Sequence, residues 1–279
     1  MRKSITTSLL ISVLVAGVLA CDGAPATTAV TLSRESFHSA ALDRTMRYHV
    51  VVPAAAATSR VPVLYLLHGH GGEEGDWFRY ARVTALASQY NVAVVTPDGA
   101  NSWYINGGSG RWRDYIADDL VREVEARWPV KTTREGRAVA GLSMGGYGAM
   151  NLALHRPELF ALAASMSGAL DITRTNNVFE GGRRVDQELR AAFGPPDSAT
   201  RRDNDIYRLA SEADASKLPY LHVDCGLDDP WMGVNREFMQ VLARRGIAHD
   251  FHELPGNHNW RYWDRQVEVV LALAAKRLK

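Results

Sequence analysis

Residues 137–154 have the sequence RAVAGLSMGGYGAMNLAL, in which a serine flanked by glycines separates two different patterns. Residues 137–142 form a short apolar run that is typical of a strand buried on both faces, and residues 144–154 read as a helix. At the junction, Gly141, Ser143 and Gly145 form a G-x-S-x-G motif. A sharp strand-to-helix turn strains the serine backbone, and glycines are needed where side chains would collide. The motif therefore predicts a nucleophilic serine, against the alternative of a glycine-rich turn with an idle serine.

Apolar runs and helical periods alternate along the rest of the chain. Strands are expected at 47–52, 62–67, 92–96, 137–142, 161–166, 218–223 and 247–254. Helical spacing runs through 117–128 until Pro129, and it recurs from Trp263 to Ala274. This alternation predicts the α/β class, with a mostly parallel central sheet and helices on both faces. We interpret the polar stretch at about 171–217 as a small helical insertion above the sheet rather than a second domain.

Length and composition favour one large globular domain. The chain has 279 residues, 32 Lys+Arg, 31 Asp+Glu and a formal net charge of +1, with no block of like charges. These values make nucleic acid a poor partner. Two cysteines cannot form a disulfide framework, and apolar neighbours predict that Cys225 is an inert buried thiol.

The N-terminus has the pattern of an export signal. Arg2 and Lys3 precede an uncharged apolar run at 8–20, which is short for a membrane span and ends at Cys21. Small residues before this cysteine resemble a bacterial lipobox, so we expect a lipoprotein signal peptide at 1–20 and lipidation of Cys21. Ordinary cleavage after residue 20 and a retained anchor helix are the alternatives. In each case the protein is exported from the bacterial cytoplasm, as a membrane-anchored lipoprotein or as a periplasmic or secreted protein. A flexible tether at 21–33 then leads into the domain at 34–279.

A second glycine-rich segment, His68-Gly69-His70-Gly71-Gly72, follows the expected strand at 62–67. Its glycines leave backbone amides exposed, so we expect the His70 amide, or alternatively that of Gly71, to bind an oxyanion together with the Met144 amide at a helix N-terminus. His68 is expected to hold this loop in place. The His-x-His spacing also suits zinc, but the Asp-His pair that such metallo-hydrolases add downstream is missing. We therefore expect no metal and no cofactor.

The general base is expected in a loop after the last strand. His258 lies in Pro255-Gly256-Asn257-His258-Asn259-Trp260, between the strand at 247–254 and the final helix. Two carboxylates, Asp228 and Asp229, follow the preceding strand, after a turn at Gly226. We assign Asp229 as the acid that orients the His258 ring, with Asp228 as second choice, although either could instead cap a helix.

Six segments of the chain together resemble the esterase D / antigen 85 family of α/β-hydrolases. They are SFHSAALDRTMRYHVVVP (36–53), PVLYLLHGHGG (62–72), VVTPDGANSWYIN (94–106), GLSMGGYGAM (141–150), CGLDDP (225–230) and PGNHNW (255–260). The resemblance implies the α/β-hydrolase fold, with Ser143 as nucleophile, Asp229 as acid and His258 as base. Where the family commonly has Leu or Met after His-Gly, this chain has His70, which makes the pocket wall more polar.

The resemblance also implies an activity. Together with the export signal, it predicts an exported serine carboxylic-ester hydrolase that acts on short-chain acyl or carbohydrate-linked (acetyl or feruloyl) esters. Its partner would be a small-molecule or glycan ester, and it would meet a membrane only through a lipid anchor. An acyltransferase of the antigen 85 type and a non-catalytic binding protein are the alternatives, and the oligomeric state is left open.

Four aromatic residues have candidate roles near this site. Trp103 and Tyr104 follow the strand at 92–96, where they would either stack on a sugar or aryl group or pack the insertion onto the body. Trp260 and Trp263 are expected to close the core behind His258.

Overall fold

The computed structural model describes residues 30–175, 179–180, 183–184 and 186–279. The predicted signal peptide at 1–20, Cys21 and most of the predicted tether lie outside the described residues. Within the described part of the chain, no helix is long and apolar enough to cross a membrane.

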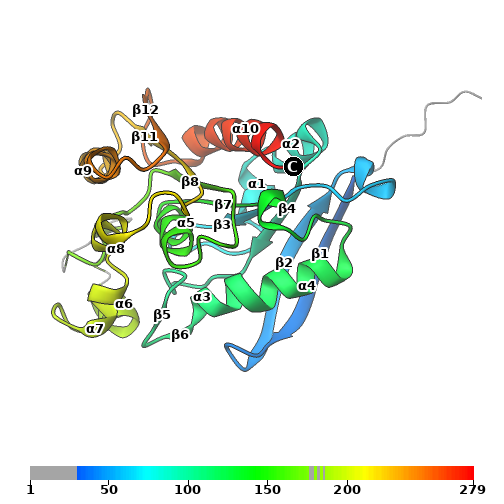
Figure 1. The fold of residues 1–279 in the computed structure, drawn as a ribbon. Helices are drawn as coiled ribbons and strands as arrows, with labels where there is room; N and C mark the ends of the chain where they lie inside the picture. The colour runs from blue at the N-terminus through cyan, green and yellow to red at the C-terminus, as the bar shows by residue number, and fades with distance from the viewer. Residues whose placement is uncertain (1–29, 176–178, 181–182, 185) are drawn as a thin grey trace, which may run out of the picture.

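An eight-stranded sheet forms the centre of the domain, in the order β1-β2-β4-β3-β7-β8-β11-β12 (Figure 1). Its strands are β1 (Thr31–Ser39), β2 (Arg44–Val52), β3 (Val63–Leu67), β4 (Ala93–Pro97), β7 (Arg137–Leu142), β8 (Leu162–Met166), β11 (Tyr220–Gly226) and β12 (His249–Leu254). The first two strands form an antiparallel hairpin, β2 pairs antiparallel with β4, and all other pairs are parallel. The predicted α/β class and mostly parallel sheet are confirmed.

Every residue of β3, β4, β7 and β8 is buried, as expected for central strands covered on both faces. Strand β1 was not predicted, because it lies at an edge of the sheet and its sequence is polar apart from Leu32 and Phe37. It pairs with β2 from Thr31 onward, so the predicted tether at 21–33 extends too far by three residues.

Helices cover both faces of the sheet. They are α1 (Asp76–Tyr80), α2 (Val83–Tyr90), α3 (Trp112–Asp114), α4 (Val121–Arg127), α5 (Met144–His155), α6 (Asp186–Phe193), α7 (Ala199–Asp203), α8 (Ile206–Glu212), α9 (Met232–Arg244) and α10 (Trp260–Arg277). Short segments complete the chain: the 3₁₀ turns η1 (Ala54–Ala57) and η3 (Arg134–Gly136), the π-helical turn η2 (Tyr115–Leu120), and the two-residue strands β5 (Asn106–Gly107), β6 (Gly110–Arg111), β9 (Phe179–Glu180) and β10 (Arg183–Arg184).

The core consists of two hydrophobic clusters, one on each face of the sheet. Helices α1, α2 and α10 pack on one face, against side chains such as Leu64, Val94 and Ala140. Helices α4, α5 and α9 pack on the other face, against side chains such as Tyr65 and Val139. Figure 1 shows α2 and α10 next to each other, and Arg82 joins them through an ion pair with Asp264 at 3.0 Å.

The segment between β8 and β11 contains β9, β10, α6, α7 and α8. Buried residues of α6 and α8, among them Phe193 and Ile206, belong to the cluster on the α5 face. This helical segment therefore packs on the main body of the domain. It lies beyond the carboxyl end of β8, close to the loops that follow β3 and β4.

Candidate active site

Ser143 occupies a strained turn between β7 and α5. Its φ is 52° and its ψ is −115°, in the positive-φ region that L-residues seldom adopt. A Cβ atom on Gly141 would lie 2.4 Å from the carbonyl carbon of Gly145, and one on Gly145 would lie 2.6 Å from the carbonyl oxygen of Leu67. The G-x-S-x-G glycines are thus required by close backbone contacts on both sides of the serine.

Three side chains from separate loops form a continuous hydrogen-bonded row. The Nε2 atom of His258 lies 3.1 Å from Ser143 Oγ, and its Nδ1 atom lies 2.9 Å from Asp229 Oδ2. The carboxylate accepts from Nδ1–H, which leaves Nε2 as an acceptor for the serine hydroxyl. The structure therefore brings together the three residues predicted as nucleophile, base and acid, in the order that proton transfer needs.

The loops that carry Asp229 and His258 are joined along their backbones. Leu227 N–H donates to Leu254 O at 2.9 Å, and Asp228 N–H donates to Gly256 O at 2.9 Å. The Asp229 side chain is fully buried, and its Oδ1 accepts from Trp231 N–H at 2.9 Å. Asp228 is exposed, and no described contact links its side chain to His258. Of the two candidate acids, only Asp229 faces the base.

The loop after β3 is held by His68, which is buried. Nδ1–H of His68 donates to Gly69 O at 2.7 Å, and Gly99 N–H donates to Nε2 at 2.9 Å. Burial lowers the pKa of His68, which keeps the ring in the neutral form that these two bonds require. The histidine thus ties the glycine-rich loop to the loop after β4, in the structural role expected from the sequence.

A second set of polar contacts connects the same loop to helix α6. Nε2 of His70 lies 2.5 Å from Glu188 Oε2, which also accepts from Asn101 Nδ2 at 3.2 Å. Oδ1 of Asn101 in turn accepts from Gly71 N–H at 2.7 Å. Because the Gly71 amide is engaged in this way, it is a poorer oxyanion donor than the sequence alternative assumed. The His70 and Met144 amides remain the predicted pair, with Met144 as the first residue of α5.

Ser143 and His258 open into a cavity of about 210 Å³. Glycine-rich backbone, aromatic rings and polar groups line it together: Gly69, His70, Gly71, Gly72, Asp76, Leu142, Ser143, His258, Trp260 and Trp263. This volume is below the range of about 300–1,000 Å³ that is usual for ligand sites. The cavity is therefore suited to a small group next to the serine.

Trp103 and Tyr104 do not line this cavity, which corrects their assignment as substrate-binding residues. Both are buried, with at most 1% of their surface exposed. The Trp103 ring packs against Tyr147 and against Phe193 of α6, each at 6.0 Å. Tyr104 Oη–H donates to His68 O at 3.0 Å. The packing alternative is the correct one, since these rings join the inserted helices and the glycine-rich loop to the body.

The aromatic wall of the cavity comes instead from the start of α10. Trp263 meets the His258 ring edge to face, with centroids 4.9 Å apart and planes at 88°. Trp260 stands perpendicular to Trp263 and to Trp77, at centroid distances of 5.4 Å and 5.2 Å. Both tryptophans were expected only behind the histidine. Their spacing of three residues at a helix start, directly after His258, was the available signal that one face of α10 lines the site.

Similarity to known proteins agrees with this geometry. A model of the family described as "Putative esterase" matches residues 39–272. An acetyl esterase of Caldicellulosiruptor saccharolyticus is 30% identical over 217 residues, which cover 75% of this chain and 82% of that protein. A diacylglycerol acyltransferase/mycolyltransferase Ag85B of Mycobacterium leprae is 27% identical over 244 residues, covering 75% and 74% of the two chains.

Solved structures share the fold at lower identity. A fluorophosphonate-binding serine hydrolase of Staphylococcus aureus superposes with a TM-score of 0.79 at 24% identity. The alignment covers 88% of this chain and 98% of that chain. This likeness shows that the sheet and helices have the arrangement of a serine hydrolase with the α/β-hydrolase fold.

Proposed function

The chain belongs to the esterase D / antigen 85 family of α/β-hydrolases and is a carboxylic-ester hydrolase, and from this premise we propose that it works through Ser143, His258 and Asp229 by an acyl-enzyme mechanism. The observation that carries the proposal is the row Ser143 Oγ–His258 Nε2 and His258 Nδ1–Asp229 Oδ2, at 3.1 Å and 2.9 Å. An idle serine in a tight turn would need neither the buried carboxylate nor the opening into a cavity.

In the first half of the reaction, His258 Nε2 takes the Ser143 hydroxyl proton while Oγ attacks the ester carbonyl carbon. The resulting oxyanion would be held by the amides of Met144 and His70, at the N-terminus of α5 and in the glycine-rich loop. The tetrahedral intermediate collapses as the bond to the alcohol oxygen breaks and His258 returns the proton to the leaving alcohol. Asp229 stabilises the imidazolium throughout.

Water completes the cycle. His258 takes a proton from a water molecule, whose oxygen attacks the acyl-enzyme carbonyl carbon. The bond to Ser143 Oγ then breaks, the serine regains its proton and the carboxylic acid leaves. The chain supplies every group that these steps use.

For the substrate we propose a short acyl group carried on an alcohol or a sugar. The cavity of about 210 Å³ next to Ser143 supports a small acyl group, since a long chain would not fit within it. Its indole rings provide flat apolar surfaces that suit an acyl chain or a sugar face. The 30% identical relative is an acetyl esterase, which supports the same choice.

We further propose that the enzyme is exported as a lipoprotein. Arg2, Lys3, the apolar run at 8–20 and Cys21 support this proposal from the sequence alone. Mass spectrometry of the N-terminal peptide from a bacterium that expresses the full chain tests it. A diacylglyceryl-modified Cys21 at the N-terminus supports lipidation. An unmodified N-terminus at Cys21 or an uncleaved chain contradicts it.

Hydrolysis of p-nitrophenyl esters from acetyl to dodecanoyl, and of methyl ferulate, tests the reaction and the acyl length. We expect turnover that falls as the acyl chain lengthens and that disappears in Ser143→Ala. Equal rates on acetyl and dodecanoyl esters would contradict the short-acyl assignment. Absence of turnover on every ester by folded protein would contradict the enzymatic assignment and favour a binding protein.

Acyl transfer is the second candidate, because a mycolyltransferase is among the relatives. The same acyl-enzyme would then react with a sugar or alcohol instead of water. Product analysis with p-nitrophenyl acetate and trehalose or glycerol separates the two. Acylated sugar in excess over free acid would favour the transferase.

A further inference from the structure

Four ionisable side chains alternate in a square on the last two strands of the sheet. The parallel register of β11 and β12 places His222 beside Asp250 and Asp224 beside His252. All four positions share one face of the sheet, because residues two apart on a strand point the same way. Tyr262 of α10 touches this face, with its hydroxyl donating to Asp224 Oδ1 at 2.8 Å. The square is thus distinct from the Ser143 cavity, whose lining residues do not include any of its members.

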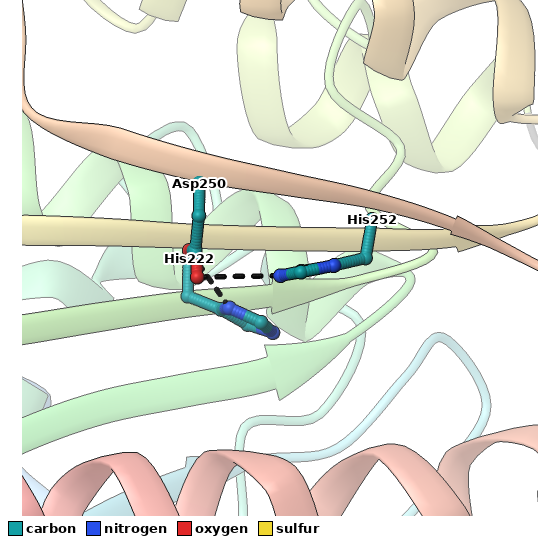
Figure 2. A group of neighbouring side chains, drawn as sticks. All are labelled: His222, Asp250 and His252. Atoms are coloured by element: carbon teal, nitrogen blue, oxygen red, sulfur yellow. Dashed lines mark hydrogen bonds and ion pairs between the residues drawn. The ribbon is translucent and has the colours of Figure 1, made fainter.

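Three of these side chains converge on one point. His222 Nδ1 lies 2.9 Å from Asp250 Oδ1, and His252 Nε2 lies 3.3 Å from Asp250 Oδ2. The three donor atoms all lie within 4.8 Å of one another. Figure 2 shows the Asp250 carboxylate to one side of the two imidazole rings, with an interaction to each. Within the described ranges, this is the one cluster of three such residues close enough to share a metal ion.

We propose that His222, Asp250 and His252 form a zinc-binding site at the β12 edge of the sheet. Two imidazole nitrogens and one carboxylate are a ligand set that Zn²⁺ prefers. Tetrahedral zinc with bonds of about 2.1 Å separates its ligand atoms by about 3.4 Å. The Asp250 oxygens lie 2.9 Å and 3.3 Å from the two imidazole nitrogens, and no two of the three donor atoms are more than 4.8 Å apart. Small side-chain adjustments would therefore bring the three atoms to the separation that tetrahedral zinc requires. Solvent would supply the fourth ligand.

Asp224 lies next to the second ring nitrogen of His222, the one that does not face Asp250. His222 Nε2 and Asp224 Oδ2 lie 3.4 Å apart, in an ion-pair contact between two side chains that are at least 99% buried. Neither atom makes a hydrogen bond within the described part of the chain. Zinc at Nδ1 would place the ring proton on Nε2, directly opposite this carboxylate. A metal-bound histidine usually donates its other N–H to such an acceptor. Metal binding at Nδ1 would therefore turn this buried contact into a hydrogen bond from Nε2–H to Asp224.

Charge and access also suit a divalent cation. With both rings neutral, Asp224 and Asp250 give the square a charge of −2, which one Zn²⁺ would cancel. The side chains of His252 and Asp250 are 50% and 29% exposed, so an ion reaches the site from solvent without unfolding the sheet.

Through Asp224 and Tyr262, the ion would stabilise the junction of β11, β12 and α10. Asn259, the residue that follows His258, accepts a hydrogen bond from Tyr262 N–H at 3.1 Å, so the same tyrosine is also connected to the loop of the base. The proposed role is structural, and the ester reaction takes no step through the metal.

A proton is the competitor for this site. Burial opposes the charging of His222, but the nearby carboxylates of Asp224 and Asp250 outweigh it and raise the pKa of His222 to about 9. In a protein without a metal, a charged His222 would therefore balance the two carboxylates. Zinc must displace this proton, so its affinity decides which state the molecule adopts near neutral pH.

Titration of untagged protein with ZnCl₂ after EDTA treatment tests the proposal. Isothermal calorimetry should find one tight site, and thermal unfolding at a free zinc concentration 100-fold above Kd should shift Tm upward by about 5–10 °C. Co²⁺ in place of zinc should give the intense visible absorption of tetrahedral coordination. His252→Ala and Asp250→Asn should each weaken zinc binding by at least about 10–100-fold, since loss of a ligand costs no less than loss of a supporting contact.

His249→Ala is the matched control. It removes a histidine from the same strand, but from the opposite face, where His249 Nδ1 bonds to Ile247 O. This variant should bind zinc like the unchanged protein. Zinc binding that persists in His252→Ala and Asp250→Asn would place the ion elsewhere and overturn the proposal. The absence of binding at millimolar zinc would also overturn it, and the four side chains would then form a hydrogen-bonded network without a metal ion.

Discussion

The Nε2 atom of His258 lies 3.1 Å from the hydroxyl oxygen of Ser143, although 115 positions of sequence separate the two residues. Each follows the carboxyl end of a parallel strand, Ser143 after β7 and His258 after β12. Strands β8 and β11 lie between them in the sheet, and the loop after β11 supplies Asp229. Because parallel strands end at one edge, the fold itself assembles the three side chains.

Replacement of the serine separates catalysis from folding. Ser143→Ala should lower kcat on p-nitrophenyl acetate by at least about 10⁴-fold, because no covalent intermediate can form. The strained turn is fixed by backbone contacts, so we expect Tm to stay within about 2 °C of the unchanged protein. Steady-state kinetics and thermal unfolding check the two expectations. Full activity in folded Ser143→Ala would disprove the mechanism.

The neighbouring aspartates provide a matched pair. Asp229→Asn should lower kcat by about 10³–10⁴-fold, because an amide facing Nδ1 favours the wrong histidine tautomer. Asp228→Asn should leave kcat within about twofold, since this side chain is exposed and the contribution of residue 228 to the site is its backbone N–H. Kinetics of both variants on one ester is sufficient. The reverse order of effects would reassign the acid.

The central strands were predictable because a strand that is buried on both faces consists of a continuous run of apolar residues. Runs such as 62–67 and 137–142 hold apolar residues without alternation, and they coincide with β3 and β7. Strand β1 has no such run, since it lies at an edge and contains two large apolar residues, Leu32 and Phe37, in an otherwise polar segment. Its place depends on pairing with β2, a long-range contact that local pattern does not encode.

The site was predictable where a motif constrains the backbone. Gly141 and Gly145 indicate the turn that holds Ser143, since a side chain at either position would collide with neighbouring backbone atoms. The directions of side chains in loops were not predictable. Trp103 and Trp260 both follow strands, yet the first is buried under α6 and the second lines the cavity. That difference arises from tertiary packing.

Addition of a single methyl group at Gly145 should lower the free energy of unfolding. In Gly145→Ala, Cβ would lie 2.6 Å from the backbone oxygens of Leu67 and His68, which cannot move without distorting β3. We expect a loss of about 3 kcal/mol in the free energy of unfolding, or failure to fold. Gly233→Ala is the control, because Gly233 lies in α9 with nothing within 4 Å of its Cβ position. It should gain about 0.5–1 kcal/mol from helix propensity. Urea unfolding measures both, and equal effects would contradict the steric argument.

Glu188 should act on the reaction through the glycine-rich loop. Glu188→Ala removes the acceptor shared by His70 Nε2 and Asn101 Nδ2, which connects α6 to the loop of the predicted oxyanion donor. We expect kcat to fall by about 10-fold, because donors to an oxyanion work only when held in place. The free energy of unfolding should change by less than about 0.5 kcal/mol, as the side chain is 49% exposed.

Glu212→Ala is the matched control for Glu188→Ala. It removes an exposed glutamate from α8, in the same inserted segment, whose partner is Arg208. This variant should leave kcat unchanged. If Glu188→Ala also leaves kcat unchanged, α6 does not position the loop.

His155 at the end of α5 should make the protein less stable in mild acid. Burial and the nearby charge of Arg113 lower its pKa from 6.5 to about 4. Between these two values the unfolded chain binds a proton that the folded protein does not, so stability is complete above pH 6.5 and falls as pH decreases toward 4. From pH 7 to pH 5 this one group accounts for a loss of about 2 kcal/mol. His155→Gln should reduce the pH dependence by that amount in urea unfolding at the two pH values. His38→Gln, at a histidine whose side chain is 63% exposed, should follow the unchanged protein. An undiminished pH dependence in His155→Gln would place the acid sensitivity in other groups.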